Sequence, residues 1–222
     1  EINVADPYSE LVLDPFNDPF IDNTVFPNIP AYPEDKTTEL ITWVRLNQPE
    51  YQWQVPNFQR PDQDELVVYE LLIRDFDAAH TFNSVVNRLD YLEDLGINAI
   101  ELMPVNEFDG NISWGYNPAL HGALDKYYGT PEDFKNFVDE CHLRGIAVIL
   151  DVVYNHATGQ NPYYRMWNDC NGCTVGQATN DNPFFNINDP NTSFSFFNDM
   201  DHESTDMEEY MDRMNLYWLE EY

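Results

Sequence analysis

Three polar residues interrupt or end an apolar run in the stretch ILDVVYNH, residues 149–156, and their types suit chemistry better than packing. Asp151 lies near the middle of the run, and Asn155 and His156 lie at its end. A carboxylate in a buried strand needs hydrogen-bonding partners or a positive neighbour, so Asp151 is either a structural aspartate or a functional one. The choice depends on the elements that position this strand and its end.

Strands and helices alternate around this run. Apolar strands are predicted at 66–76, 97–105 and 146–155, with helices near 82–95 and 131–144 between them. This order predicts a parallel sheet with right-handed crossovers, in either an open doubly wound sheet or a (β/α)₈ barrel. Ligands bind at the carboxyl ends of the strands in both folds. No glycine-rich phosphate loop follows the first strand, which disfavours a nucleotide-binding sheet.

Local signals mark the ends of the helices. Thr130 is a predicted N-cap, with Pro131 at the first helical position and Asp133 at the third, and Gly145 ends that helix. Glycine at position 96 ends the preceding helix in the same way.

A last helix is predicted at 205–222. Thr205 with Glu208 three residues later predicts a capping box at its start. The helix has one apolar face, formed by Met207, Tyr210, Met211, Met214, Tyr217 and Trp218.

Two segments lack sustained periodicity. Residues 1–62 are rich in Pro, Asn and Asp and contain short β-like pieces, ELVLDPF and ELITWVRL, between turn signals, which predicts the end of a small β domain and an extended linker. Residues 157–200 follow the third strand and predict an irregular excursion over the top of the sheet. The excursion would form one wall of a substrate cleft.

The charge balance excludes some partners. The chain has 222 residues, of which 40 are Asp or Glu and 10 are Lys or Arg, and its net charge is −30. A nucleic-acid partner is not expected, because a phosphate-binding face needs clustered basic residues. The acid excess indicates either a solvated surface, as in a secreted or salt-tolerant protein, or acids that bind calcium.

The three cysteines and the chain ends add little. Cys170 and Cys173 form a lone CxxC without a second pair to complete a zinc site, so a local disulfide or two free thiols are expected, and Cys141 is predicted to lie in the core. No apolar run is long enough to cross a bilayer. The chain opens on Glu1 without a signal-peptide pattern, so we expect an extracellular or cell-surface protein whose signal peptide lies outside this sequence.

Several stretches, taken together, resemble the α-amylase family of glycoside hydrolases, (β/α)₈-barrel enzymes that act on α-glucans. The segment DVVYNH (151–156) resembles the family's first conserved region. In order along the chain, the similar stretches are VVYELLIRDF, LGINAIELMPVNEF, SWGYNPALHGALDKYYGTPEDFK, CHLRGIAVILDVVYNHATGQ and DMDHESTDMEEYMDRMNLYWLEEY. The resemblance covers about residues 66–222. The stretch VADPYSELVLDPFND resembles the end of the β-sandwich module that precedes the barrel in some bacterial members.

The resemblance implies a role for four residues. His156 corresponds to the histidine that hydrogen-bonds the sugar at the cleavage subsite, and Tyr116 to the tyrosine whose ring forms a platform for that sugar. Asp151 corresponds to the aspartate that supports the floor of the active site. Asn155 corresponds to an asparagine that ligates a structural calcium ion in many members.

Calcium at Asn155 would need further oxygen ligands from the segment after the third strand, because the ion takes six to eight. Candidate acids there are Asp169, Asp181 and Asp199, although no spacing singles them out. The alternative for Asn155 is a strand-end hydrogen bond without a metal.

The resemblance also places the catalytic carboxylates outside this sequence. Members of the family retain configuration with a nucleophile after the fourth strand, in a pattern like GFRxD, and further acids after the fifth and seventh strands. The sequence given stops at Tyr222, before that fourth strand. Glu101 and Glu107 do not match these acids, and we expect them to be structural.

The resemblance thus predicts an α/β fold: a partial (β/α)₈ barrel with its first three strand–helix units. We expect the end of a β-sandwich module and linker at 1–62, the first part of the barrel at 63–156, the excursion at 157–200, and the third barrel helix at 201–222. The expected function is that of an α-1,4-glucan hydrolase, with α-glucan as its partner. A branching enzyme, or a non-catalytic glucan-binding or structural protein on the same barrel, is the alternative.

Overall fold

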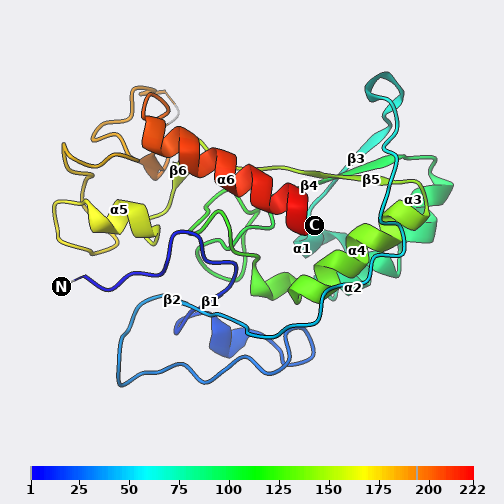
Figure 1. Ribbon diagram of the computed structural model, residues 1–222, viewed down its shortest axis with the longest axis horizontal. Helices are drawn as coiled ribbons and strands as arrows, with labels where there is room; N and C mark the ends of the chain where they lie inside the picture. Colours follow the sequence, from blue (N-terminus) through cyan, green and yellow to red (C-terminus); the bar gives the residue numbers. More distant parts are fainter. Residues whose placement is uncertain (1, 194) are drawn as a thin grey trace.

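The computed structural model contains a three-stranded parallel sheet, on the right in Figure 1. The structure describes residues 2–193 and 195–222; Glu1 and Phe194, which fall in the predicted 1–62 and 157–200 segments, lie outside the described residues. The strands are β3 (Val68–Leu71), β4 (Ala99–Leu102) and β5 (Ala147–Leu150), in the order β3-β4-β5. The predicted parallel arrangement of three adjacent strands is confirmed.

The first strand is shorter than the predicted 66–76. It ends at Leu71, and residues Ile73–Phe76 form the short helix α1. The amide of Met103 donates to the carbonyl of Leu71, but the amides of Asp75 and Phe76 turn back to the carbonyl of Leu72. The apolar pattern therefore continues beyond the point at which the neighbouring strand can accept hydrogen bonds.

The third strand also ends early, which corrects the position of Asp151. The strand stops at Leu150, and the amide of Asp151 makes the last bond to β4, to the carbonyl of Leu102 at 2.9 Å. Asp151 is thus the first residue beyond the sheet and not the middle of a strand. The chain then re-pairs at β6 (His156–Ala157), which is antiparallel to β7 (Asn198–Asp199).

The predicted helix at 82–95 is two helices, α2 (Phe82–Val86) and α3 (Leu89–Asp94). Arg88 leaves the helical region, and its amide makes a tighter bond to the carbonyl of Val85. The apolar spacing nevertheless holds across the break, because Val85, Leu89 and Leu92 are all fully buried. The core that they join lies between the sheet and α4.

Helix α4 (Pro131–Leu143) begins as predicted. The Thr130 hydroxyl accepts from the amide of Asp133, and the Asp133 carboxylate accepts from the amide of Thr130, which completes a capping box. Gly145 follows the helix in the left-handed region, with φ of +72°, a conformation that favours glycine. In Figure 1, α2, α3 and α4 lie together beside the sheet.

Helix α6 (Thr205–Glu221) confirms the predicted last helix but not its cap. Ser204 is the N-cap, and its hydroxyl accepts from the amide of Met207. The Ser204 hydroxyl also donates to the carbonyl of Pro183, a contact that Thr205 does not make. Of the predicted apolar face, Met207, Tyr210, Met214 and Trp218 are buried, and Met211 and Tyr217 are partly buried.

Residues 2–62 contain little regular structure and lie against the rest of the chain. Strands β1 (Val12–Leu13) and β2 (Ile41–Thr42) form a short antiparallel pair within the two predicted β-like pieces. Short 3-10 helices occur at Asp18–Phe20 and Gln63–Glu65. A small core joins this segment to the loop after β4, formed by Ala5, Val12, Leu40, Ala119, Leu120 and Ala123.

Residues 157–193 and 195–200 form a lobe at the far end of the molecule from α3, with α6 running between the two (Figure 1). The lobe contains α5 (Pro162–Met166) and a core of its own, in which Tyr164, Phe185 and Met200 pack with residues of α6. Cys170 and Cys173 form a disulfide, and Cys141 is buried as predicted. Among the described residues, no helix is both long and apolar enough to cross a membrane.

Candidate functional site

Tyr116 and Asp151 meet at the carboxyl end of the sheet. Asp151 directly follows β5, and Tyr116 comes from the long loop between β4 and α4. The Tyr116 hydroxyl donates to Asp151 Oδ2 at 2.6 Å. Burial and the neighbouring Asp151 raise the pKa of Tyr116, so the phenol stays protonated and remains a donor to the carboxylate.

His156 connects to the same tyrosine through the backbone. Its Nε2 donates to the carbonyl of Tyr116 at 2.8 Å, and its Nδ1 accepts from Asn155 Nδ2 at 3.0 Å. This network assigns the neutral tautomer with the proton on Nε2. His156 is 8% exposed, whereas Tyr116 is 36% exposed. The structure therefore brings together Tyr116, Asp151, Asn155 and His156, although their roles toward a sugar stay predictions.

Gly115 allows Tyr116 to lie close to the sheet. Its φ is +94°, and a Cβ built on it would lie 2.3 Å from the carbonyl oxygen of Pro104, just beyond β4. No side chain fits that space without moving the backbone, so glycine is required at this position.

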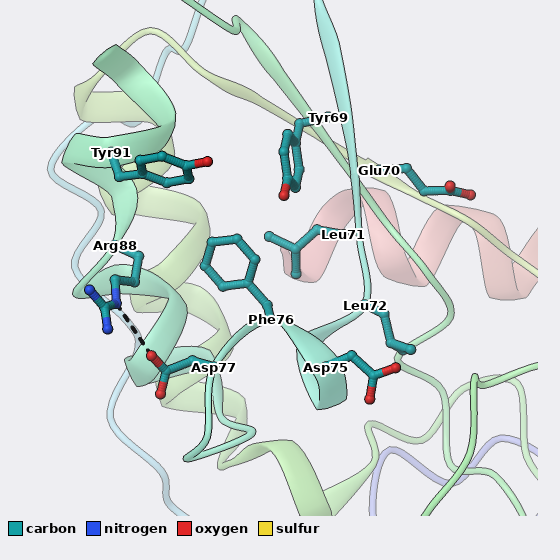
Figure 2. Close-up of a pocket in the computed structure, with 9 residues that line it drawn as sticks. All are labelled: Tyr69, Glu70, Leu71, Leu72, Asp75, Phe76, Asp77, Arg88 and Tyr91. Atoms are coloured by element: carbon teal, nitrogen blue, oxygen red, sulfur yellow. Dashed lines mark hydrogen bonds and ion pairs between the residues drawn. The ribbon is translucent and has the colours of Figure 1, made fainter. Parts of the chain in front are cut away.

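Glu101 and Glu70 are paired in register on β4 and β3. Figure 2 shows the side chains of Glu70 and Tyr69 on opposite sides of β3, and both residues line the hollow drawn there. Both glutamates add to the negative potential that raises the pKa of Tyr116. Glu70 escaped the sequence analysis because its position in the sheet depends on pairing with a strand that lies far along the chain.

Glu107 belongs to a different cluster, as its predicted structural role requires. Lys126 Nζ donates to its two carboxylate oxygens at 2.8 and 3.0 Å and lies 3.3 Å from Asp18 Oδ1. Burial raises the pKa of Glu107, and Lys126 only partly opposes the change. Burial alone would lower the pKa of Lys126, but Glu107, Asp18 and Asp125 reverse that effect and raise it.

His121 is a residue of the site region that the sequence analysis missed. Its Nε2 donates to the carbonyl of Val153 at 3.0 Å, and its Nδ1 accepts from the Tyr210 hydroxyl at 3.2 Å. Its own carbonyl accepts from Trp218 Nε1 at 2.8 Å. His121 thus ties the 151–156 segment to α6, and burial lowers its pKa to about 4.

The side chains of Asn155 and of two of the predicted calcium donors make hydrogen bonds within the protein. The Asn155 side chain donates to His156, Asp199 accepts from Asn186 Nδ2 at 2.8 Å, and Asp169 accepts from the amide of Gln177 at 3.0 Å. In residues 2–193 and 195–222, no three His, Cys, Asp or Glu side chains form a group that could hold a metal ion. Calcium at Asn155 therefore stays a prediction, and no step of the function is routed through calcium.

A hollow of about 590 Å³ lies on the other side of β3 (Figure 2). Tyr69, Phe76 and Tyr91 line it, together with the Arg88–Asp77 ion pair, in which Nε and Oδ2 are 3.3 Å apart. This space is lined by none of the four predicted site residues, Tyr116, Asp151, Asn155 and His156. We therefore place the candidate site at the strand ends, where the polar side chains converge.

Comparisons with known proteins identify the family of this chain. The family model for the α-amylase catalytic domain matches residues 54–221. A malto-oligosyltrehalose trehalohydrolase of Saccharolobus solfataricus is 42% identical over 115 residues, which are 52% of this chain and 20% of that protein. A 1,4-α-glucan branching enzyme of Halothermothrix orenii is 49% identical over 79 residues, 34% of this chain and 12% of that protein.

A solved structure is similar as well. A Salmonella typhimurium protein provisionally named an α-amylase superimposes with a TM-score of 0.63 and 31% identity, over 77% of this chain and 26% of that one. The chain spans about a fifth of the length of the trehalohydrolase it matches. The parallel sheet corresponds to part of the barrel of these proteins. The chain belongs to the α-amylase family, whose members are glycoside hydrolases or transglycosylases.

Proposed function

We propose that the protein to which this chain belongs is a retaining α-amylase-type hydrolase that cleaves α-1,4-glucans such as starch, glycogen and maltooligosaccharides. The observation that carries the proposal is the convergence of Tyr116, Asp151 and His156 at the carboxyl ends of the strands. The partly exposed ring of Tyr116 offers an apolar face to a pyranose, and His156 binds the backbone carbonyl of the same residue. The catalytic carboxylates would come from outside the 222 residues.

Asp151 would act as a support and not as an acid or nucleophile in this proposal. Its carboxylate accepts from the Tyr116 hydroxyl, which fixes the direction of the tyrosine ring. His156 fixes the backbone of the same residue through the Tyr116 carbonyl. A platform held at both ends loses little side-chain freedom when a sugar stacks on it, which favours binding of a distorted ring.

A second candidate rests on sequence identity. The trehalohydrolase is 42% identical over half of this chain, so an α-glucan carrying a terminal trehalose unit is a competing substrate. Transfer of a cut chain to form a branch is a third outcome, favoured by the identity of 49% to the branching enzyme.

One experiment separates these outcomes. The intact protein is incubated with soluble starch, with maltoheptaose and with a malto-oligosyltrehalose, and the products are followed by a reducing-sugar assay and by proton NMR of the released anomer. Hydrolysis of starch with release of the α-anomer supports the main proposal. Release of trehalose and a maltooligosaccharide from the malto-oligosyltrehalose, without hydrolysis of starch, supports the second candidate, and new α-1,6 linkages without an increase in reducing ends support the third. Absence of all three would favour a non-catalytic glucan-binding protein.

We also propose an extracellular or cell-surface location. The disulfide between Cys170 and Cys173 and the net charge of −30 favour an oxidising compartment and a strongly hydrated surface. Thiol labelling of protein isolated without reductant tests the first point, because a reduced pair in the native protein would contradict it.

A further inference from the structure

Two neighbouring phenylalanines are exposed to solvent next to the candidate site. Phe196 is 57% exposed and Phe197 is 59% exposed, and they directly precede β7. Their ring centroids lie 6.4 and 5.3 Å from that of His156. Single exposed apolar residues are ordinary, but two adjacent aromatic rings beside a polar cluster suggest contact with a ligand.

The backbone at Phe197 is held in a conformation that is costly for a bulky residue. Its φ is +53°, in the left-handed region that favours glycine and asparagine. The residues that follow fix it there, because Asn198 and Asp199 pair with Ala157 and His156, and Asn198 Nδ2 also donates to the carbonyl of Ala157 at 3.1 Å. The ring is more than half exposed, so internal packing does not account for keeping phenylalanine at this position.

His156 is near both this pair and Tyr116. Phe197 approaches the imidazole ring, and the imidazole Nε2 binds the Tyr116 carbonyl. Exposed aromatic rings thus lie next to a polar imidazole, a combination that suits a ring with apolar faces and hydroxyl edges. The chain's net charge of −30 disfavours an anionic ligand and favours a neutral one such as a sugar.

We propose that Phe196 and Phe197 form a second aromatic platform, which holds a glucose unit of the α-glucan next to the unit that stacks on Tyr116. This inference rests on the proposed function and adds two substrate-positioning residues to it. The platform would engage only chains long enough to reach both rings, so it would favour longer maltooligosaccharides over short ones.

The test compares variants of the intact protein on maltoheptaose and maltotriose. Phe196→Ala combined with Phe197→Ala is expected to lower kcat/KM for maltoheptaose about tenfold and for maltotriose much less. Phe197→Tyr keeps a ring and is expected to retain wild-type kinetics. Phe20→Ala, at a phenylalanine that is 78% exposed on the N-terminal segment, serves as the matched control and should change neither substrate.

Phe197→Gly separates a platform from a structural role. Glycine adopts the observed φ without strain, so the melting temperature is expected to stay level or rise while kcat/KM for maltoheptaose falls. A drop in melting temperature that matches the loss of activity would show that the ring serves packing, and would overturn the platform. If the wild-type protein cleaves α-glucans and both alanine substitutions leave the maltoheptaose kinetics unchanged, only the platform is wrong. A wild-type protein inactive on every α-glucan would overturn the proposed function first, and the platform with it.

Discussion

The loop between β4 and α4 supplies residues to two polar clusters that differ in their exposure to solvent. In the first, Lys126 and Glu107 lie on the loop and Asp18 comes from the N-terminal segment, and the side chain of Lys126 is only 1% exposed. All polar partners of this cluster come from the chain itself. In the second, Tyr116 lies on the same loop and its hydroxyl donates to Asp151 at the end of the sheet, while its side chain is partly exposed to solvent.

The two clusters therefore differ in the exposure of their side chains more than in residue type. Both clusters contain carboxylates with a donor at hydrogen-bond distance, and both join segments that are far apart in sequence. A closed cluster can only stabilise the fold, because a ligand cannot reach it. In a cluster that is exposed to solvent, a bound sugar can replace the water that contacts the side chains. The variants of Lys126, His156 and Tyr116 below each disturb one cluster and leave the other intact, and a variant of His121 tests the contact between the 151–156 segment and α6.

The largest expected effect is on stability. Lys126→Met would leave Glu107, Asp18 and Asp125 buried without their cation, and we expect a loss of about 3–5 kcal/mol in the free energy of unfolding. Urea denaturation measures it. Lys36→Met is the control, because Lys36 is paired with Asp35 at the surface and its change should stay within about 0.5 kcal/mol. Equal midpoints for both variants would show that the Lys126 cluster does not stabilise the fold.

The next effect is on activity. His156→Ala in the intact protein removes the bond to the Tyr116 carbonyl and the proposed bond to the sugar. We therefore expect kcat/KM on maltoheptaose to fall by a factor that corresponds to about 2–4 kcal/mol of activation free energy. His202→Ala, at an exposed histidine, is the matched control. Wild-type kinetics in the His156 variant would refute the role given to this residue.

The third effect is a pH dependence carried by His121. Burial holds its folded-state pKa at about 4, below the ordinary 6.5, so the unfolded chain binds a proton that the folded chain does not. Its contribution to stability is therefore present above about pH 6.5 and is lost as the pH falls to about 4, by roughly 3 kcal/mol in all.

Comparison with a His121→Gln variant isolates this term. Burial raises the pKa values of Glu107 and Asp125, and these acids act in the opposite direction, because they favour the folded state as the pH falls. The difference in unfolding free energy between wild type and variant should shrink between about pH 6.5 and 4. A difference that stays constant over this window would contradict a neutral buried His121.

The smallest expected effect concerns the hydroxyl of Tyr116. Tyr116→Phe keeps the ring but removes the donor to Asp151. We expect kcat/KM to fall by a factor that corresponds to about 1 kcal/mol of activation free energy, less than in Tyr116→Ala. Tyr91→Phe, at an exposed tyrosine on α3, is the control. If the phenylalanine and alanine variants of Tyr116 are equally impaired, the hydroxyl and not the ring is the main contribution.

The sequence predicted those features that depend on neighbours in the chain. Thr130, Pro131 and Asp133 carry a complete helix start within four positions, and the structure has that start. The strand ends at Leu71 and Leu150 were not predictable, because they depend on which carbonyl of β4 lies opposite. The apolar pattern continues past both points.

Long-range partners limited the rest. Ser204 and Thr205 are equally suited to cap α6, and the choice follows from a contact to Pro183 that lies 21 positions away. His121 binds Val153 and Tyr210 at separations of 32 and 89 positions, so its own neighbourhood gave no signal. The proximity of Tyr116 to Asp151 and His156 came from the resemblance to the family and not from spacing.

The contacts between the N-terminal segment and the loop after β4 can form only after the ribosome has made both segments. Asn111 Nδ2 donates to the carbonyl of Asn17 at 2.8 Å, and these residues are 94 positions apart. A ribosome adding about 5–20 residues per second needs about 5–20 s to cover that distance. For this interval Val12 and Leu40, which are buried in the finished fold, have no partner from Ala119 or Leu120. During synthesis the apolar side chains of the N-terminal segment are therefore exposed to other chains until the loop after β4 has been made.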